Sequence, residues 1–168
     1  ISKILPGDQD KDVNIFFTSN HILFEFDSTT VVSRLIEGDY LKIDNILSAD
    51  YETKVTINKR EFHSCIDRST LLVKEGDKKP IILNILDDVM ELRMNSVIGS
   101  LNEEIDISKT GKDLMIGFDP KFLIDALKVI DDEQVEIKLL NSKAPCFIRD
   151  DEENYTYLIL PVAFNSLN

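Results

Sequence analysis

The feature of this sequence that most constrains its fold is an internal repeat. When the first segment is aligned with the last so that Val13 meets Val135, the apolar residues coincide at alternate positions as far as Phe17 and Leu139. Both segments have the pattern of a helix, an acidic turn and three strands, and residues 58–107 follow the same order. We therefore expect three copies of one helix-plus-strands unit.

The copies differ in completeness. Two of them, over roughly 53–164, make a complete domain, and the first is half of another domain. Each unit can bury the inner face of its helix only against sheet, so paired units share a core. The expected class is α+β, with helices on one face and antiparallel sheets on the other.

Two helices are predicted, over 58–76 and 119–130. Asn58 is an N-cap candidate with Glu61 three residues later, close to a capping box. Asp119 is followed by Pro120, a favoured pairing at a helix start. The apolar residues that the helical period turns inward are Phe62, Cys65, Ile66, Ser69, Leu72 and Val73 on the first helix, and Phe122, Leu123, Ala126, Leu127 and Ile130 on the second.

The rest of the chain has the alternation of strands, separated by turns rich in Asp, Asn, Gly and Ser. The expected strands are 13–18, 21–27, 30–37, 53–57, 80–86, 89–95, 98–107, 112–118, 134–140, 144–149 and 155–162.

Composition narrows the class of protein. The 168 residues carry a formal net charge of −12, which argues against a general nucleic-acid coat or a membrane-surface protein but leaves room for a local basic face. No apolar run is long enough for a transmembrane helix. Cys65 and Cys146 lack metal or redox spacing and are expected to be buried, reduced thiols of a cytoplasmic protein. The start at Ile1 is typical of a fragment of a longer protein.

No catalytic motif is present. His21 and His63 have no metal-site pattern, and no phosphate-binding glycine loop or nucleophile elbow occurs. The acidic pairs 87–88, 131–132 and 150–151 fall at predicted turns, where solvated carboxylates are the better interpretation than an acid/base pair. We expect a non-enzymatic protein without cofactor or metal.

Three stretches resemble one known family. They are 33-SRLIEGDY-40, 116-IGFDPKFLIDAL-127 and 157-YLILPV-162. Together, and in this order, they are similar to segments of the bacterial sliding clamps, the beta subunit of DNA polymerase III. The resemblance implies the DNA-clamp fold, with 1–40 as the second half of the middle domain, 41–52 as a linker and 53–168 as the C-terminal domain.

The family's function follows as an expectation from the resemblance. Its members are non-catalytic processivity factors that form a head-to-tail ring homodimer around duplex DNA, without sequence preference. The implied partners are the DNA polymerase III catalytic subunit, the clamp loader and other proteins that insert a short peptide into a groove. No membrane partner is implied.

The resemblance also assigns residues to three sites. The peptide-binding groove would include Leu41, Asn45, Ile46, Pro145, Leu158, Leu160, Pro161 and Val162. The helix residues facing DNA would be Lys3, Lys59, Arg60, His63, Lys121 and Lys128. The dimer interface would involve Leu71, Leu72, Glu103, Glu104 and Ile105.

Alternatives remain open at each site. An apolar linker beside an apolar terminal strand makes a peptide-binding patch, but the same residues would also cement a domain junction. The basic residues share their helix faces with Asp67 and Asp125, as ordinary solvated faces do. The chain departs from the family pattern at Leu41, Asn45, Lys143 and Ala163. An unrelated β-rich module that binds one protein partner, or a hydrolase using turn carboxylates, would be the competing functions.

Overall fold

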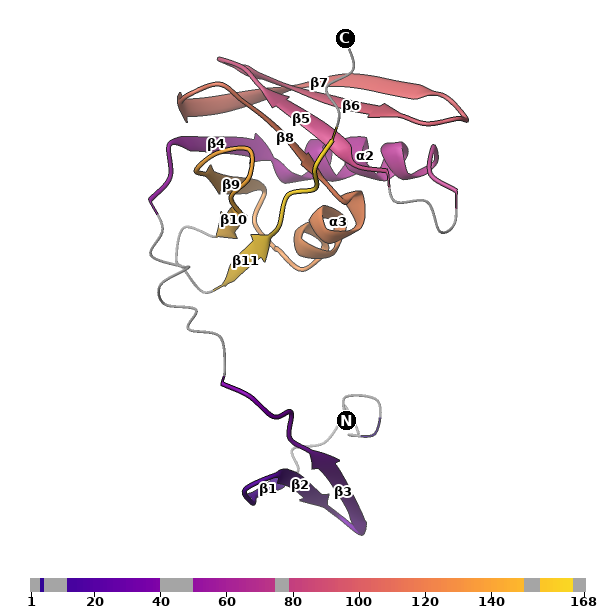
Figure 1. The fold of residues 1–168 in the computed structure, drawn as a ribbon, viewed down its shortest axis with the longest axis vertical. Coiled ribbons are helices and arrows are strands. Elements are labelled where there is room, and N and C mark those ends of the chain that lie inside the picture. Colours follow the sequence, from indigo (N-terminus) through magenta and orange to yellow (C-terminus); the bar gives the residue numbers. More distant parts are fainter. Residues whose placement is uncertain (1–3, 5–11, 40–49, 75–78, 150–154, 165–168) are drawn as a thin grey trace. The chain divides into compact units, whose positions relative to one another are not determined.

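The structure is a computed structural model that describes residues 4, 12–39, 50–74, 79–149 and 155–164. The chain divides into two compact units, Ile1–Leu47 and Ser48–Asn168. The boundary falls within the segment 41–52 that the resemblance assigns to a linker. Figure 1 shows the elements of each unit.

The first unit is a three-stranded antiparallel sheet of β1 (Asn14–Phe17), β2 (His21–Phe26) and β3 (Thr29–Arg34). A tight turn joins β2 to β3, with Asp27 in the left-handed region at φ 47°. In the described part of this unit only Phe26 is buried, whereas Ile15 and Phe17 remain exposed. The helix expected before it falls on residues that the structure does not describe, apart from Ile4.

The second unit is built on one antiparallel sheet of order β11-β10-β9-β4-β7-β6-β5-β8. Its elements are β4 (Thr53–Asn58), α2 (Lys59–Thr70), β5 (Ile81–Ile85), β6 (Val89–Asn95), β7 (Ser100–Gly111), β8 (Leu114–Phe118), α3 (Pro120–Lys128), β9 (Gln134–Leu139), β10 (Cys146–Arg149) and β11 (Thr156–Ile159).

The predicted repeat is present in this unit as two runs of strand, helix and three strands. The first run is β4-α2-β5-β6-β7 and the second is β8-α3-β9-β10-β11. The strand that precedes each helix pairs with the other run, because β4 pairs with β9 and β8 pairs with β5. The strands β4, β7, β6 and β5 of the first run are continuous in the sheet, and the second run extends this sheet at both ends, with β9 beside β4 and β8 beside β5.

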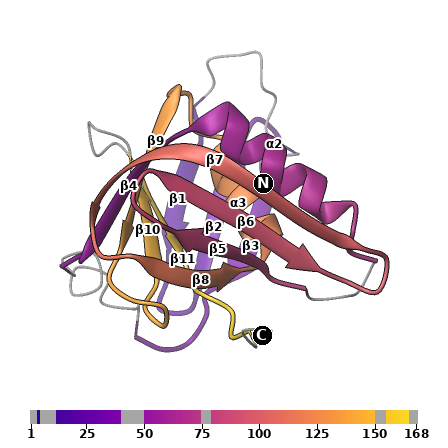
Figure 2. The ribbon, with the colours of Figure 1, turned by 90° about the horizontal axis from the view of Figure 1, so that it is seen from above.

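Helix α2 packs against β4, β6, β7 and α3, and α3 packs against α2 and β11. The helices lie side by side within the curl of the sheet (Figure 1), and α2 runs alongside β7 when the unit is seen from above (Figure 2). Between sheet and helices lies a continuous core whose fully buried members include Phe62, Ile66, Met90 and Phe118.

Both predicted helix starts are confirmed. The Asn58 side chain accepts a hydrogen bond from the Glu61 N–H, 3.1 Å away, and the Asp119 carboxylate accepts from the Lys121 N–H at 3.0 Å. The first helix ends at Thr70, earlier than predicted. The hydroxyls of Ser69 and Thr70 donate to backbone carbonyls three residues back, a local bond that competes with the helical ladder.

The inward face predicted for α3 was wrong at one residue. Phe122 is 56% exposed, whereas Ile124, which the helical period did not select, is buried. Because α3 packs against both α2 and β11, its buried arc includes Leu123, Ile124 and Ala126, and Phe122 is left at the open side.

Strand β7 is longer than the predicted 98–107. Its first half, Ser100–Asp106, pairs with β6, and its second half, Ile107–Gly111, pairs with β4. Strand β4 pairs with β7 only from Ile107 onward and then continues into α2. Within the described residues, the first half of β7 therefore has β6 on one side and an open edge on the other.

Candidate functional site

An apolar groove lies between α3 and β11. It has a volume of about 390 Å³ and is lined by Phe122, Asp125, Ala126, Tyr157, Leu158, Ile159 and Leu160. The Asp119 cap and Pro120 fix the start of α3 and thereby place Phe122 in its first turn. The pairing of Leu158 with Phe147 fixes the opposite wall.

The lining of this groove leaves large apolar side chains in water. Phe122 is 56% exposed, Leu160 is 65% exposed and Leu158 is 37% exposed. Burying one such side chain under a ligand contributes roughly 1.5–3 kcal/mol. The shape and the exposed side chains together suit an apolar peptide anchor.

The residues that the resemblance assigned to the groove are placed as follows. Leu158 and Leu160 line it, and Pro161 and Val162 continue the chain directly beyond it. Pro145 precedes β10 at the end where Cys146 pairs with Ile159, so it lies at the same end of these strands as Leu160. The linker residues Leu41, Asn45 and Ile46 lie outside the described residues.

Sequence reasoning missed other lining residues, namely Phe122, Asp125, Ala126, Tyr157 and Ile159. The helical period assigned Phe122 and Ala126 to the core. A signal was available for Phe122, since it belongs to the family-like stretch 116–127. The period alone does not distinguish a core aromatic from one that faces a groove.

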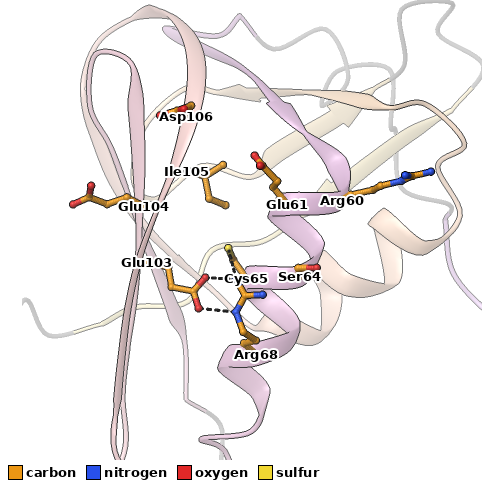
Figure 3. A pocket seen from close by; sticks show the side chains of 9 residues that line it. All are labelled: Arg60, Glu61, Ser64, Cys65, Arg68, Glu103, Glu104, Ile105 and Asp106. Carbon is orange, nitrogen blue, oxygen red and sulfur yellow. Dashed lines mark hydrogen bonds and ion pairs between the residues drawn. The ribbon is translucent and has the colours of Figure 1, made fainter.

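A second hollow lies between α2 and β7 and has a volume of about 440 Å³. It is lined by Arg60, Glu61, Ser64, Cys65, Arg68, Glu103, Glu104, Ile105 and Asp106 (Figure 3). Alternation along β7 points Glu103 toward the helix and Glu104 away from it (Figure 3). The open edge of β7, Ser100–Asp106, borders this hollow.

Arg68, Glu103 and Cys65 form one hydrogen-bonded group in this hollow. The Arg68 guanidinium donates from Nε to Glu103 Oε1 at 2.7 Å and from Nη2 to Glu103 Oε2. The same Nη2 donates to Cys65 Sγ at 3.1 Å. The hydrogen bonds from Arg68 hold the pKa of the Glu103 carboxyl below its usual range. Burial, and next the neighbouring Glu103 carboxylate, raise the pKa of the Cys65 thiol to about 12.

Of the residues expected at a dimer interface, Glu103, Glu104 and Ile105 line this hollow, and Leu71 and Leu72 follow the end of α2. Leu71, directly after α2, is 77% exposed, and Leu72 is half-buried. Glu104 is exposed. Ile105 is buried in the core of its own unit, so its side chain makes a local core contact and only its backbone lies on the strand edge.

The residues expected to face DNA lie on the two helices. Lys121 and Lys128 are exposed on α3, and Arg60 is exposed on α2. His63 is half-buried. Lys59 is also half-buried, and its amine donates to the Ile130 carbonyl, which ties the start of α2 to the segment after α3. Lys3 lies outside the described residues.

The expected thiols and turn carboxylates are also placed. Cys65 and Cys146 are buried and free. The pairs 87–88 and 131–132 are exposed between elements, while 150–151 is not described. Within the described residues, no three His, Cys, Asp or Glu side chains gather as a metal site, and no helix is long and apolar enough to cross a membrane.

Comparison with known proteins gives one consistent family. Residues 44–163 match the family model described as DNA polymerase III beta subunit, C-terminal domain. A beta sliding clamp of Staphylococcus aureus is 38% identical over 165 residues, which are 96% of this chain and 44% of that protein. The chain therefore spans less than half the length of the curated relatives it matches.

Solved structures agree. A crystal structure described as a DNA polymerase III beta subunit of Eubacterium rectale is 69% identical, with a TM-score of 0.87, and the match covers 98% of this chain and 45% of that one. The DNA polymerase sliding clamp of Bacillus subtilis is 33% identical, with a TM-score of 0.84, and the match covers 98% and 44%.

Proposed function

Because the chain belongs to the DNA polymerase III beta subunit family, we propose that it is the C-terminal part of a bacterial sliding clamp, the processivity factor of the replicative polymerase. The role is non-catalytic: the clamp holds other proteins on DNA. The observation that carries this proposal is the exposed apolar groove between α3 and β11, which lies within the family-matched residues.

In this role the groove takes short peptides from the polymerase III catalytic subunit, the clamp loader and other DNA-processing proteins. Phe122, Leu158 and Leu160 supply the apolar contacts for a peptide anchor. Leu41, Asn45 and Ile46 of the linker, together with Pro145, Pro161 and Val162, complete the site by family resemblance. The domain division into 1–40, 41–52 and 53–168 belongs to the same proposal.

The full-length protein forms a head-to-tail ring homodimer in this proposal. The open edge of β7 offers unpaired backbone groups over Ser100–Asp106, and strand addition to such an edge is a recurring mode of association. Leu71, directly after α2, adds an exposed apolar side chain, and Glu104 on β7 adds an exposed carboxylate. A strand from the partner subunit's first domain is the occupant that the family resemblance implies.

Duplex DNA passes through the ring. Arg60, Lys121 and Lys128 are exposed on the helices and are available to phosphates, with Lys3, Lys59 and His63 as further family-implied positions. Contacts of this kind are independent of sequence and weaken with salt. The net charge of −12 keeps DNA away from the remaining surface.

The test is a titration of the chain with a short peptide that begins with Gln and ends with Leu-Phe, followed through backbone amide chemical shifts. We expect the largest shifts at Phe122, Leu158 and Leu160. The matched control is the same peptide with Ala-Ala at its end. Absence of shifts at millimolar peptide, or equal shifts with the control peptide, would contradict the proposed groove.

A further inference from the structure

The segment after β11 crosses to the other end of the sheet. Although residues 160–164 form no strand, the Val162 N–H donates a hydrogen bond to the Gly117 carbonyl oxygen at 2.8 Å. Gly117 lies in β8, the last strand of the eight-stranded sheet, which pairs with β5 on one side only. The terminal segment therefore lies along the outer edge of β8.

Gly117 leaves room for this segment. A Cβ atom at this position would lie 2.7 Å from Phe164 Cδ1 and 3.0 Å from the Val162 carbonyl oxygen. The first distance is shorter than real Cβ atoms show, so the Phe164 ring would have to move, and the second is tighter than most real Cβ contacts, so the backbone of Val162 would be crowded. The Gly117 backbone is outside the left-handed region, so glycine is required here for space and not for its dihedral angles.

The aromatic ring of Phe164 takes the place that a Gly117 side chain would occupy. Ile116 and Phe118 point into the core, and alternation along β8 turns position 117 to the opposite face with Met115. Met115 is exposed on that face, whereas Gly117 is buried. The contact with Phe164 accounts for this burial, an arrangement known to stabilise glycine at a sheet edge.

The terminal segment, residues 160–164, is continuous with the wall of the groove. Leu160 lines the groove, Val162 is hydrogen-bonded to Gly117, and only Pro161 lies between them. Proline holds its φ near −65°, so Pro161 has little backbone freedom with which to absorb a displacement of Val162. Such a displacement would therefore also move Leu160. The position of Leu160, the more exposed of the two groove leucines, therefore depends on β8, a strand that does not line the groove.

We propose that Gly117 is a positioning residue for the apolar groove. Because Gly117 has no side chain, Phe164 and Val162 can pack on the edge of β8. This packing holds Leu160 in the position that the ligand contacts. The inference rests on the proposed function of the groove, but it concerns the geometry of the groove wall and is tested separately from ligand identity.

The experiment compares Gly117→Ala with Gly99→Ala in the full chain. A Cβ at Gly99 would meet only Leu72 Cδ2, at an ordinary 3.6 Å, so Gly99→Ala is a matched glycine control. We expect Gly117→Ala to weaken binding of the Gln…Leu-Phe peptide about tenfold and Gly99→Ala to leave it unchanged. Phe164→Ala should also weaken binding, because it removes the ring without adding bulk at Gly117.

The double variant separates positioning from general destabilisation. If Gly117→Ala acts by displacing the ring, it should cause a smaller further loss of affinity in the Phe164→Ala background than in the native chain. Equal losses in both backgrounds, or unchanged affinity in Gly117→Ala, would overturn the proposal.

A readout without ligand keeps the inference independent of the proposed function. In the free protein, the amide shifts of Leu158 and Leu160 should move in Gly117→Ala and stay in place in Gly99→Ala. If the native chain bound no peptide, the proposed function would fail while these shifts still decided the role of Gly117. Unchanged shifts at both leucines would refute it.

Discussion

Arg68 of α2 and Glu103 of β7 form a bidentate ion pair. The pair joins the helix to Ser100–Asp106, the half of β7 that has the open edge. Planar guanidinium and carboxylate groups match each other in this geometry, which fixes orientation as well as adding attraction. The pair also holds Cys65, whose sulfur accepts a hydrogen bond from the same guanidinium. The helix end and the strand edge of the proposed dimer interface are thereby held together before any partner arrives.

The first prediction concerns pH. Arg68 keeps the pKa of Glu103 below its ordinary value of 4.5, so the folded state favours the ionised carboxylate. Its stabilisation is present above pH 4.5 and is lost as the pH falls through the lowered pKa of the folded state. Because half of the Arg68 side chain is exposed, we expect Glu103→Gln to lower the free energy of unfolding at pH 7 by about 1 kcal/mol or less.

Urea unfolding curves at pH 7 and pH 3 measure this effect. The difference between native protein and Glu103→Gln should shrink at the lower pH. Glu104→Gln is the matched control, since the neighbouring carboxylate points away from α2 (Figure 3). A Glu103→Gln loss that is the same at both pH values would contradict the role given to the ionised carboxylate.

The second prediction concerns the thiols. Burial raises the pKa of Cys65 and of Cys146 to about 12, and Glu103 adds to the effect at Cys65. At pH 8 only ~1 in 10,000 of each thiol is then ionised, and the thiolate is the reactive form. We expect negligible reaction with an aromatic disulfide reagent in the native protein and reaction of both thiols in urea. Rapid labelling of the native protein at pH 8 would refute the prediction.

Much of the fold could be predicted from local pattern. The Asn58 and Asp119 caps and the order of the described strands follow from spacing within short windows of the sequence, and the repeat follows from matching such windows along the chain. The extent of β7 could not be predicted in this way. Its last residues, 108-SKTG-111, are polar like a turn, and only the pairing with β4 makes them strand. Partners distant in sequence decide such boundaries.

The groove was predicted in part, and only through the family-like stretch 157–162. Leu158 and Leu160 belong to that stretch, whereas Phe122 was assigned to the core by helical period. The period identifies an apolar arc but not which part of the arc meets sheet and which part meets solvent. The packing of α3 between α2 and β11 decides this, and a single sequence does not reveal it.

The third prediction tests the aromatic wall of the groove. Phe122→Ala should weaken peptide binding about tenfold, because truncating an aromatic that contacts an anchor commonly costs more than 1 kcal/mol. It should change the melting temperature little, since Phe122 is 56% exposed. Val129→Ala is the control: Val129 is 60% exposed at the end of the same helix and does not line the groove. Equal affinity in the two variants would count against Phe122 as a contact residue.

The fourth prediction concerns charge. Among the described residues that line the groove, Asp125 alone is charged, and within the described chain no hydrogen bond or ion pair holds its carboxylate. A peptide with Lys beside its apolar anchor should therefore bind about threefold more tightly than the same peptide with Glu there, the size expected of an exposed ion pair. The preference should weaken in added salt and vanish in Asp125→Asn, as calorimetric titration of both peptides would show. A preference that survives in Asp125→Asn would place the charge recognition elsewhere on the chain.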